Sequence, residues 1–308
     1  MKAISCALAM VMSLVVPAPA TEVVEGEDRE LAPATEAVKG EDEEPAPADQ
    51  KVFGKSQEAS YKDQVVVVEI GKFDLMNSQS YTFMRRTLQR AEDEGAKAVV
   101  FSLNTPGGSA DDTKNLMRAM VATEVPIYSF INPEAGSAGA LICAATESIY
   151  MAPSSLVGAA ALVDGTGQEI EEVLRKKLES FYGAHVRAIA ERRGHNPDVL
   201  DAMMFISEED RTFGSVTVEA GELLTLYAEK AVEEVDGKPI FAKGIVTSVE
   251  ELLEKEGLGG TPVVKADQTA FERIAWWVKL LSPLLIIIGL GAAYAEMKVC
   301  LLYTSPSP

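Results

Sequence analysis

Three apolar, β-branched runs alternate with segments of helical spacing, and this alternation limits the possible folds more than any other feature. The runs are VVVVEI (65–70), AVVFSL (98–103) and VPIYSFI (125–131). Unbroken apolar runs of this length are typical of strands that are buried on both faces. Strands that alternate with helices form βαβ units around a mainly parallel sheet, so the sequence predicts an α/β fold.

The pattern after these runs extends the same order of elements. We expect helices at 78–95, 110–122, 138–146, 168–193, 197–204, 223–235 and 248–256, and further short strands at 148–153, 216–219 and 244–247. The folded domain is therefore predicted to cover residues 61–258.

The N-terminal 60 residues have a different character. Residues 1–20 read as a secretory signal peptide, because Lys2 precedes a short apolar run that ends in Ala-Pro-Ala. Residues 21–60 begin with a 14-residue duplication, TEVVEGEDRELAPA followed by TEAVKGEDEEPAPA. This composition offers too little apolar surface to offset the entropy of ordering, so we expect an acidic, disordered linker.

The C-terminal end has a membrane signature. Residues 274–295 carry one charge, Lys279, and begin with paired tryptophans at 276 and 277, as a transmembrane helix often does. The last ten residues, 299–308, fit nothing before them, and we interpret them as an artefactual tail.

Composition excludes several classes of function. The net charge of −19 is unsuited to binding nucleic acid. The two histidines and three cysteines have no metal-ligand spacing, so neither a metal nor another cofactor is expected.

Two turns after strands could hold a catalytic site. Thr105-Pro106-Gly107-Gly108 follows one buried run and could point backbone N–H groups at a substrate carbonyl. Gly136-Ser137-Ala138-Gly139 lies between a strand and an apolar helix. The motif alone favours neither of two roles for Ser137: it could be a nucleophile, or it could be the N-cap of the following helix.

One lysine lies on the apolar face of the 168–193 helix. Lys177 has Val173 and Leu174 four and three residues before it, respectively, and Phe181 four residues after it, whereas Lys176 lies on the polar side. A desolvated lysine can be neutral and act as a general base, as in Ser–Lys enzymes. The alternative is a lysine that snorkels at the edge of the stripe.

The histidines compete with the lysine for the role of base. His185 lies two turns beyond Lys177 on the same helix and could also face inward, and His195 follows in what reads as the end of that helix. Neither histidine has an evident acid to orient it.

Taken together, these motifs resemble the NfeD family of membrane-bound, Clp-protease-like serine proteases. The matching stretches are AVVFSLNTPGG, GSAGALI, SIYMAPSSLVGAA and KLESFYGAHVRAIAERRGHN. The resemblance implies a crotonase-like or Clp-protease-like spiral of βαβ units, with Ser137 as nucleophile and Lys177 as base. It also implies oxyanion donors among the backbone N–H groups of Gly107, Gly108 and Ala138.

The resemblance further implies a membrane-anchored endopeptidase that cleaves hydrophobic peptide segments. A stomatin-like partner or substrate, a homo-oligomer and a protease domain on the extracytoplasmic (periplasmic) side are expected. Two alternatives remain open at this stage: a signal-peptide peptidase of the same fold, and a non-catalytic membrane scaffold that binds a stomatin-like partner. An acyl-CoA enzyme of the same fold is disfavoured, because an exported protein would lack the cofactor.

Overall fold

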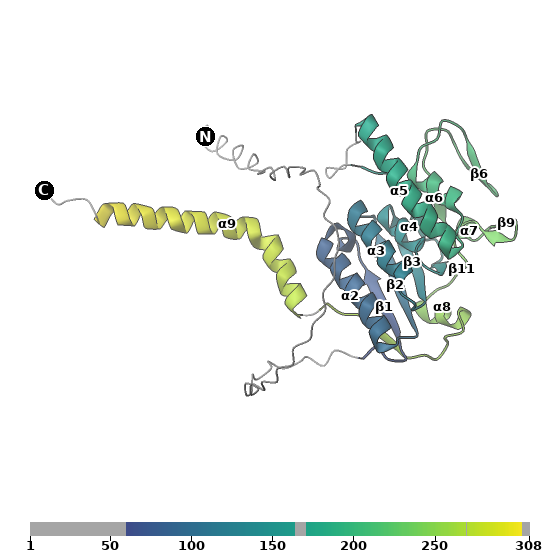
Figure 1. The fold of residues 1–308 in the computed structure, drawn as a ribbon, viewed down its shortest axis with the longest axis horizontal. Coiled ribbons are helices and arrows are strands. Elements are labelled where there is room, and N and C mark those ends of the chain that lie inside the picture. Colours follow the sequence, from purple (N-terminus) through teal and green to yellow (C-terminus); the bar gives the residue numbers. More distant parts are fainter. Residues whose placement is uncertain (1–59, 164–170, 269, 304–308) are drawn as a thin grey trace, which may run out of the picture. The chain divides into compact units, whose positions relative to one another are not determined.

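A computed structural model gives the structure and describes residues 60–163, 171–268 and 270–303 (Figure 1). The signal peptide predicted at 1–20 lies outside these residues, as does the linker predicted at 21–60 apart from its last residue. The described residues begin with Ser60, and the domain start expected at residue 61 stays a prediction.

A mixed, eight-stranded sheet forms the centre of the described domain. Its strands are β1 (Val65–Ile70), β2 (Ala98–Thr105), β3 (Ile127–Gly136), β4 (Ser148–Met151), β5 (Leu156–Gly158), β8 (Thr225–Tyr227), β11 (Gly244–Ile245) and β12 (Val263–Lys265). The order is β11-β4-β3-β2-β1-β12, and β5 joins the end of β3 and pairs with β8. All neighbours are parallel except β5 and β8, as the βαβ pattern predicts.

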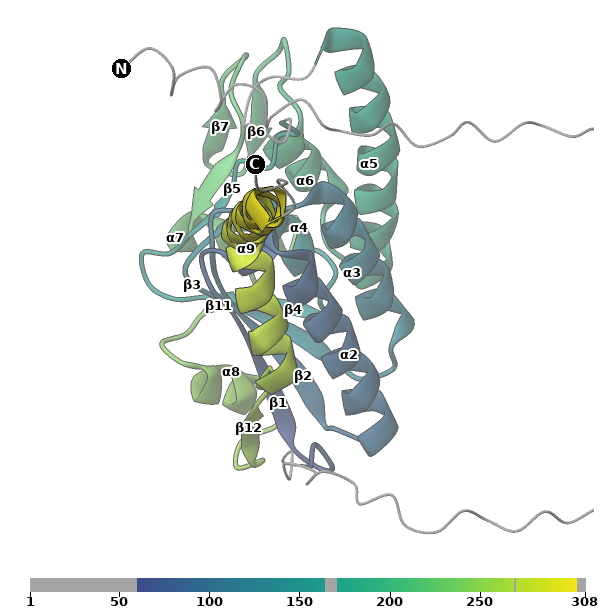
Figure 2. The same cartoon turned by 90° about the vertical axis from the view of Figure 1, so that its left-hand side faces the viewer.

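Helices cover both faces of the sheet. They are α2 (Ser78–Glu94), α3 (Ala110–Ala122), α4 (Ala138–Cys143), α5 (Glu172–Arg193), α6 (Pro197–Met204), α7 (Ala228–Ala231) and α8 (Val249–Lys255), with a 3-10 turn, η2 (Asp74–Met76). Figure 2 shows α2 and α3 on one face and α8 on the other. Two small hairpins complete the domain: β6 (Arg211–Phe213) with β7 (Val216–Val218), and β9 (Glu234–Val235) with β10 (Lys238–Pro239).

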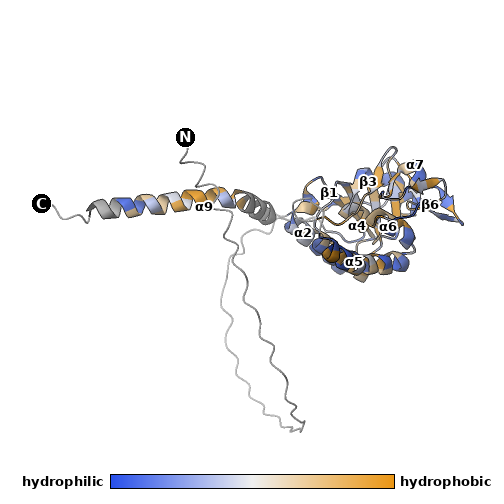
Figure 3. Ribbon diagram, turned by 90° about the horizontal axis from the view of Figure 1, so that it is seen from above, coloured by the Kyte–Doolittle hydropathy of each residue, from blue (hydrophilic) through white to orange (hydrophobic). Residues whose placement is uncertain are grey.

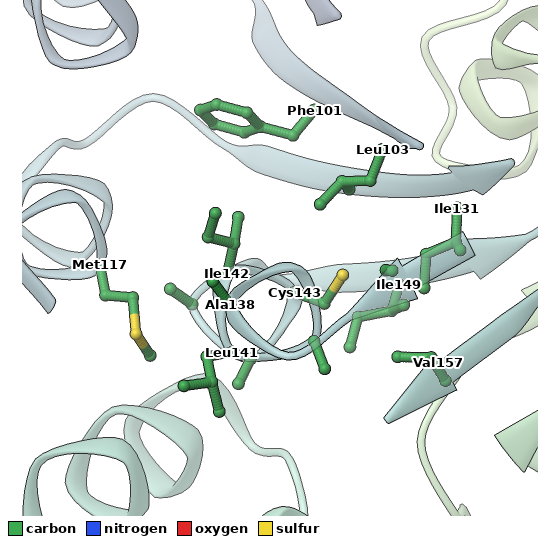
Figure 4. Packing of buried hydrophobic residues seen from close by; sticks show 14 of the residues in the cluster. Phe101, Leu103, Met117, Ile131, Ala138, Leu141, Ile142, Cys143, Ile149 and Val157 are labelled. Atoms are coloured by element: carbon green, nitrogen blue, oxygen red, sulfur yellow. The ribbon is translucent and has the colours of Figure 1, made fainter. Parts of the chain in front are cut away.

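The larger core lies under α2, α3 and α4. Alternate residues of β2 point into it, among them Phe101 and Leu103, and the whole of α4 is buried there (Figure 4). The intervening β2 residues, such as Val100, face a smaller core under α8. Burial on both faces explains why these strands read as continuous apolar runs.

Two predicted boundaries differ from the structure. The single helix expected at 223–235 is instead β8, the one-turn helix α7 and β9, because β5 recruits residues 225–227 as an antiparallel partner. The chain also contributes β12 beyond residue 258, and β12 pairs with β1 at the edge of the sheet.

The C-terminal helix α9 (Ala270–Tyr303) includes the span predicted at 274–295 and the start of the predicted artefactual tail. Within the described residues it is the one helix long and apolar enough to cross a membrane, over Leu281–Lys298 (Figure 3). Pro283 lies inside it.

Candidate active site

The carboxyl ends of two neighbouring parallel strands bring the two predicted turns together. β2 ends at Thr105 and β3 at Gly136, so the turns that follow lie at the same edge of the sheet. Contact between them is tight: a Cβ on Gly107 would lie 2.6 Å from the Cβ of Ser137 and 3.1 Å from its Oγ. A glycine at position 107 is what allows the serine this close to the other turn.

Ser137 has a backbone conformation that serine rarely adopts. Its φ is 48° and its ψ −117°, a region that favours glycine because it has no Cβ. Its N–H donates to the carbonyl oxygen of Gly158 at 2.9 Å, which holds the turn. Such strain costs about 1–3 kcal/mol and is concentrated at functional sites, and nucleophilic serines occupy sharp strand-to-helix turns of this kind.

The capping interpretation of Ser137 is not supported. The residue does hold the N-cap position of α4, but its side chain makes no capping hydrogen bond. Its Oγ has no hydrogen-bond partner among the described residues. The hydroxyl is therefore available for chemistry, and a strained backbone holds it beside the glycine turn.

The three expected oxyanion donors are not equivalent. The N–H of Gly107 donates to Oγ1 of Thr105 at 3.2 Å and is occupied. The N–H groups of Gly108 and Ala138 have no hydrogen-bond partner among the described residues. Backbone N–H groups without a partner, at a cavity that Ser137 also lines, are the kind of donor that can stabilise an oxyanion.

A cavity of about 670 Å³ opens at Ser137. Both turns line it, and the rest of its wall is largely apolar: Met76, Ala110, Leu141, Ala160, Ala161, Leu162 and Val163. An apolar wall with a few polar groups at one point suits the binding of an apolar chain next to a reactive group.

Gly158 supports the turn at Ser137, and the sequence analysis missed this role. It accepts the Ser137 N–H, and its own φ is 136°. A Cβ there would lie 2.3 Å from the carbonyl oxygen of Leu224. The sequence feature that could have pointed to this role is the place of Gly158 in the stretch SSLVGAA, because a glycine inside a strand pattern often marks a close backbone approach.

The burial expected for Lys177 is wrong for the single chain. Lys177 is exposed, and it is not among the described residues that line the cavity. The apolar neighbours that suggested burial are themselves exposed, Val173 by 60% and Phe181 by 58%. Helical periodicity identified an apolar face, but in the single chain Val173, Leu174 and Phe181 on that face remain exposed.

The second half of α5 is firmly held. Its buried residues begin at Tyr182, whose hydroxyl donates to Asp111 at 2.7 Å in the first turn of α3. Lys114 also reaches Asp111, at 2.8 Å, and its ammonium lies 5.0 Å from the Tyr182 ring centre. Burial is the main cause that raises the pKa of Tyr182 to about 12, and the hydrogen bond to Asp111 contributes to the same shift. This cluster joins the helix that carries Lys177 to the helix that follows the glycine turn.

Replacing Tyr182 with phenylalanine is expected to destabilise the domain by about 1 kcal/mol, because the variant loses one hydrogen bond, whose acceptor Asp111 is largely exposed to solvent. Urea unfolding measures the change. Tyr227→Phe is the matched control: Tyr227 is 46% exposed, and its hydroxyl makes no hydrogen bond to another described residue. Equal effects in the two variants would contradict a role for Tyr182 in holding α5.

Cys143 and the two histidines that compete for the role of base do not line the Ser137 cavity. Cys143 is buried in the core, and burial raises the pKa of its thiol to about 12. Neither His185 nor His195 is among the described residues that line the Ser137 cavity. His195 instead contacts the carbonyl oxygen of Thr146 at 2.7 Å, and burial lowers the pKa of both imidazoles. The described residues contain no cluster with metal-ligand character.

Comparison with known protein families finds one whose sequence pattern this chain matches. The family described as NfeD1b, N-terminal domain, matches residues 65–266, which include both turns, α5 and the whole sheet. The chain belongs to this family. The NfeD1b N-terminal domain therefore accounts for most of the described residues, and the α/β fold with a C-terminal apolar helix is confirmed.

Two curated relatives extend the comparison. The membrane protein NfeD1b of Bacillus subtilis is 30% identical over 218 residues, which cover 71% of this chain and 47% of that protein. The membrane-bound protease PH1510 of Pyrococcus horikoshii is 26% identical over 157 residues, 48% of this chain and 36% of that protein. This NfeD1b-family chain thus spans less than half the length of either relative.

A solved structure shares the fold. It is described as a 1510-N membrane-bound stomatin-specific protease, a lysine-to-alanine variant in complex with a substrate peptide. The TM-score is 0.53 at 21% identity, and the match covers 70% of this chain and 98% of that one. The Clp-protease-like fold predicted for the NfeD1b N-terminal domain is therefore confirmed.

Proposed function

We propose that this chain is a membrane-anchored serine endopeptidase in which Ser137 is the nucleophile and Lys177 the general base. One observation carries the proposal: a strained serine lines an apolar cavity together with Gly108 and Ala138, and neither its hydroxyl nor their N–H groups have a hydrogen-bond partner among the described residues. The membrane-bound protease among the relatives supports the same reaction class.

The proposed reaction is an acyl transfer. The Lys177 amine takes the proton of Ser137 Oγ as the oxygen attacks the scissile carbonyl, and the N–H groups of Gly108 and Ala138 hold the oxyanion. The carbon–nitrogen bond then breaks, and the protonated lysine returns its proton to the leaving amine. Water, deprotonated in the same way, hydrolyses the acyl ester and regenerates Ser137. None of these steps needs a metal or a cofactor.

The proposed reaction needs the Lys177 amine within reach of Ser137 Oγ. Lys177 is exposed in the single chain and does not line the Ser137 cavity, so we propose that binding of substrate or of a second copy of the chain completes this contact. Resemblance to the NfeD helix, which begins at the catalytic lysine, supports Lys177 over its neighbour. The solved relative, whose lysine was replaced in a complex with substrate peptide, gives further support.

The substrates we propose are hydrophobic peptide segments. A relative is described as specific for stomatin, so a stomatin-like membrane protein is the partner or substrate we propose here. With a signal peptide at 1–20 and the span at 274–295, the protease domain would lie on the extracytoplasmic side. A homo-oligomer, as in the NfeD family, is also part of the proposal.

The test is cleavage of an apolar peptide library by the full chain in lipid nanodiscs. Lys177→Ala is expected to lower kcat by at least ~100-fold, because the variant loses its general base. Lys176→Ala is the matched control, since Lys176 pairs with Glu172 at 2.6 Å on the exposed face and should keep full activity.

Three results would count against this assignment. Equal loss in the Lys176 and Lys177 variants would indicate a general effect on α5. Full activity of Lys177→Ala would exclude Lys177 as the base. No cleavage by folded wild type, together with capture of a stomatin-like protein, would support the non-catalytic scaffold instead.

A further inference from the structure

A short loop, Lys72–Met76, presents apolar side chains to solvent on a rigid frame. The N–H of Gly71 donates to Asp74 Oδ2 at 2.7 Å, and Asp74–Met76 form the 3-10 turn η2. Leu75 is fully buried and anchors the turn. Phe73 and Met76 point outward, 75% and 62% exposed.

This loop, the Lys72–Met76 loop, lies where the chain leaves the domain for its apolar helix. Ala266 is fixed to the sheet through its N–H, which donates to the Val67 carbonyl oxygen at 2.9 Å. Gln268 then lines a cavity of about 310 Å³ together with Lys72 and Phe73. The helix α9 begins two residues later, at Ala270.

The covalent tether limits how far the loop can be from a bilayer. The chain from Gln268 to the start of the apolar stretch at Leu281 spans at most about 24 Å, because α9 rises about 1.5 Å per residue from Ala270 and the two residues before it reach at most about 3.6 Å each. A bilayer that holds α9 therefore has its surface within this distance of the loop. The tryptophans at 276 and 277 lie between these two points, and such residues favour the level of the headgroups.

We propose that the Lys72–Met76 loop binds the surface of the lipid bilayer that α9 enters. Phe73 and Met76 would enter the boundary between headgroups and acyl chains, and the Lys72 ammonium would remain among the phosphates. Lys72 is available for this contact, because it makes no ion pair with another described residue. The Asp74 carboxylate faces inward, on the Gly71 amide.

The loop also contacts the active-site turn. The carbonyl oxygen of Leu75 accepts the Ser109 N–H at 2.9 Å, and Met76 lines the Ser137 cavity. Lipid contact at the loop would hold the mouth of this cavity at the bilayer surface, where polypeptide segments leave the membrane. This consequence for substrate choice rests on the proposed protease function, whereas the lipid contact itself does not.

Fluorescence quenching in vesicles tests the contact with the full chain. Both native tryptophans are replaced by phenylalanine, and a single tryptophan is introduced as Phe73→Trp or Met76→Trp. The matched control is Ile206→Trp, because Ile206 is 54% exposed and follows α6, which packs on β5 at the other flank of the sheet. Phosphatidylcholine with brominated acyl chains quenches tryptophan on contact.

Brominated lipid is expected to remove roughly half of the Phe73→Trp and Met76→Trp emission and to leave that of Ile206→Trp unchanged. A variant that keeps only Trp277 reports that α9 is inserted. Quenching of Trp277 without quenching at positions 73 and 76, or equal quenching at Ile206, overturns the proposal. Because no cleavage is measured, failure here leaves the protease proposal intact, and loss of cleavage leaves the lipid contact intact.

Discussion

Ser137→Ala is expected to abolish peptide cleavage, with a loss of at least ~10³-fold in kcat, and to leave the domain folded. The large effect follows from removal of the nucleophile. The small effect on stability follows from the structure, because the hydroxyl makes no capping hydrogen bond that the variant could lose. Single-turnover cleavage and urea unfolding of the same preparation measure the two quantities.

Ser137→Gly separates function from stability more sharply. Glycine adopts φ 48°, ψ −117° without the clash that a Cβ produces, so this variant should be about 1 kcal/mol more stable than wild type. It should also be inactive. An inactive protein that is more stable than its parent is the result expected where backbone strain positions a nucleophile.

Ser109→Ala is the matched control for both variants. Ser109 lines the same cavity, but its Oγ caps α3 by accepting the Asp112 N–H at 3.3 Å. This variant should lose about 1 kcal/mol of stability and keep its activity. Cleavage that survives in Ser137→Ala but fails in Ser109→Ala would contradict the assignment of the nucleophile.

Gly108→Ala is expected to destabilise the domain by at least ~3 kcal/mol, a cost typical of severe overpacking against backbone. A Cβ at this position would lie 1.8 Å from the Leu75 carbonyl oxygen and 2.3 Å from its carbonyl carbon. The Lys72–Met76 loop must therefore move away from the glycine turn. The movement would also displace the Gly108 N–H from the position of an oxyanion, so cleavage should fall as well.

Gly257→Ala provides the contrast. Gly257 has φ 74°, but a Cβ there would meet no atom within 4 Å. Its cost should be only about 1 kcal/mol, from the backbone conformation alone. Thermal unfolding of Gly108→Ala and Gly257→Ala compares the cost of a steric clash with the cost of an unfavourable backbone conformation. Similar melting temperatures would show that the close contact between Gly108 and Leu75 does not exist in solution.

The sequence pattern predicted correctly those elements that burial alone defines, and wrongly an element that pairing with a distant strand defines. The strand at 65–70 and the helix at 110–122 agree with the structure because burial of a whole strand or a helix face leaves a periodic trace. The prediction of a single helix at 223–235 was wrong. Its apolar residues suit a strand equally well, and pairing with β5 makes residues 225–227 a strand. Periodicity on α5 likewise marked an apolar face without showing what covers it.

The sequence by itself determined the class of fold, the NfeD resemblance and the two turns that could hold a catalytic site. Only the tertiary structure decided that these turns touch and that the Ser137 hydroxyl does not cap α4. It also decided that the Gly107 amide is occupied, whereas those of Gly108 and Ala138 have no partner in the part of the chain that the structure describes. The physical reason is that hydrophobic burial is recorded residue by residue along the chain. Hydrogen-bond satisfaction and backbone strain depend instead on which segments meet in space, as when Gly158 holds Ser137 from a different strand.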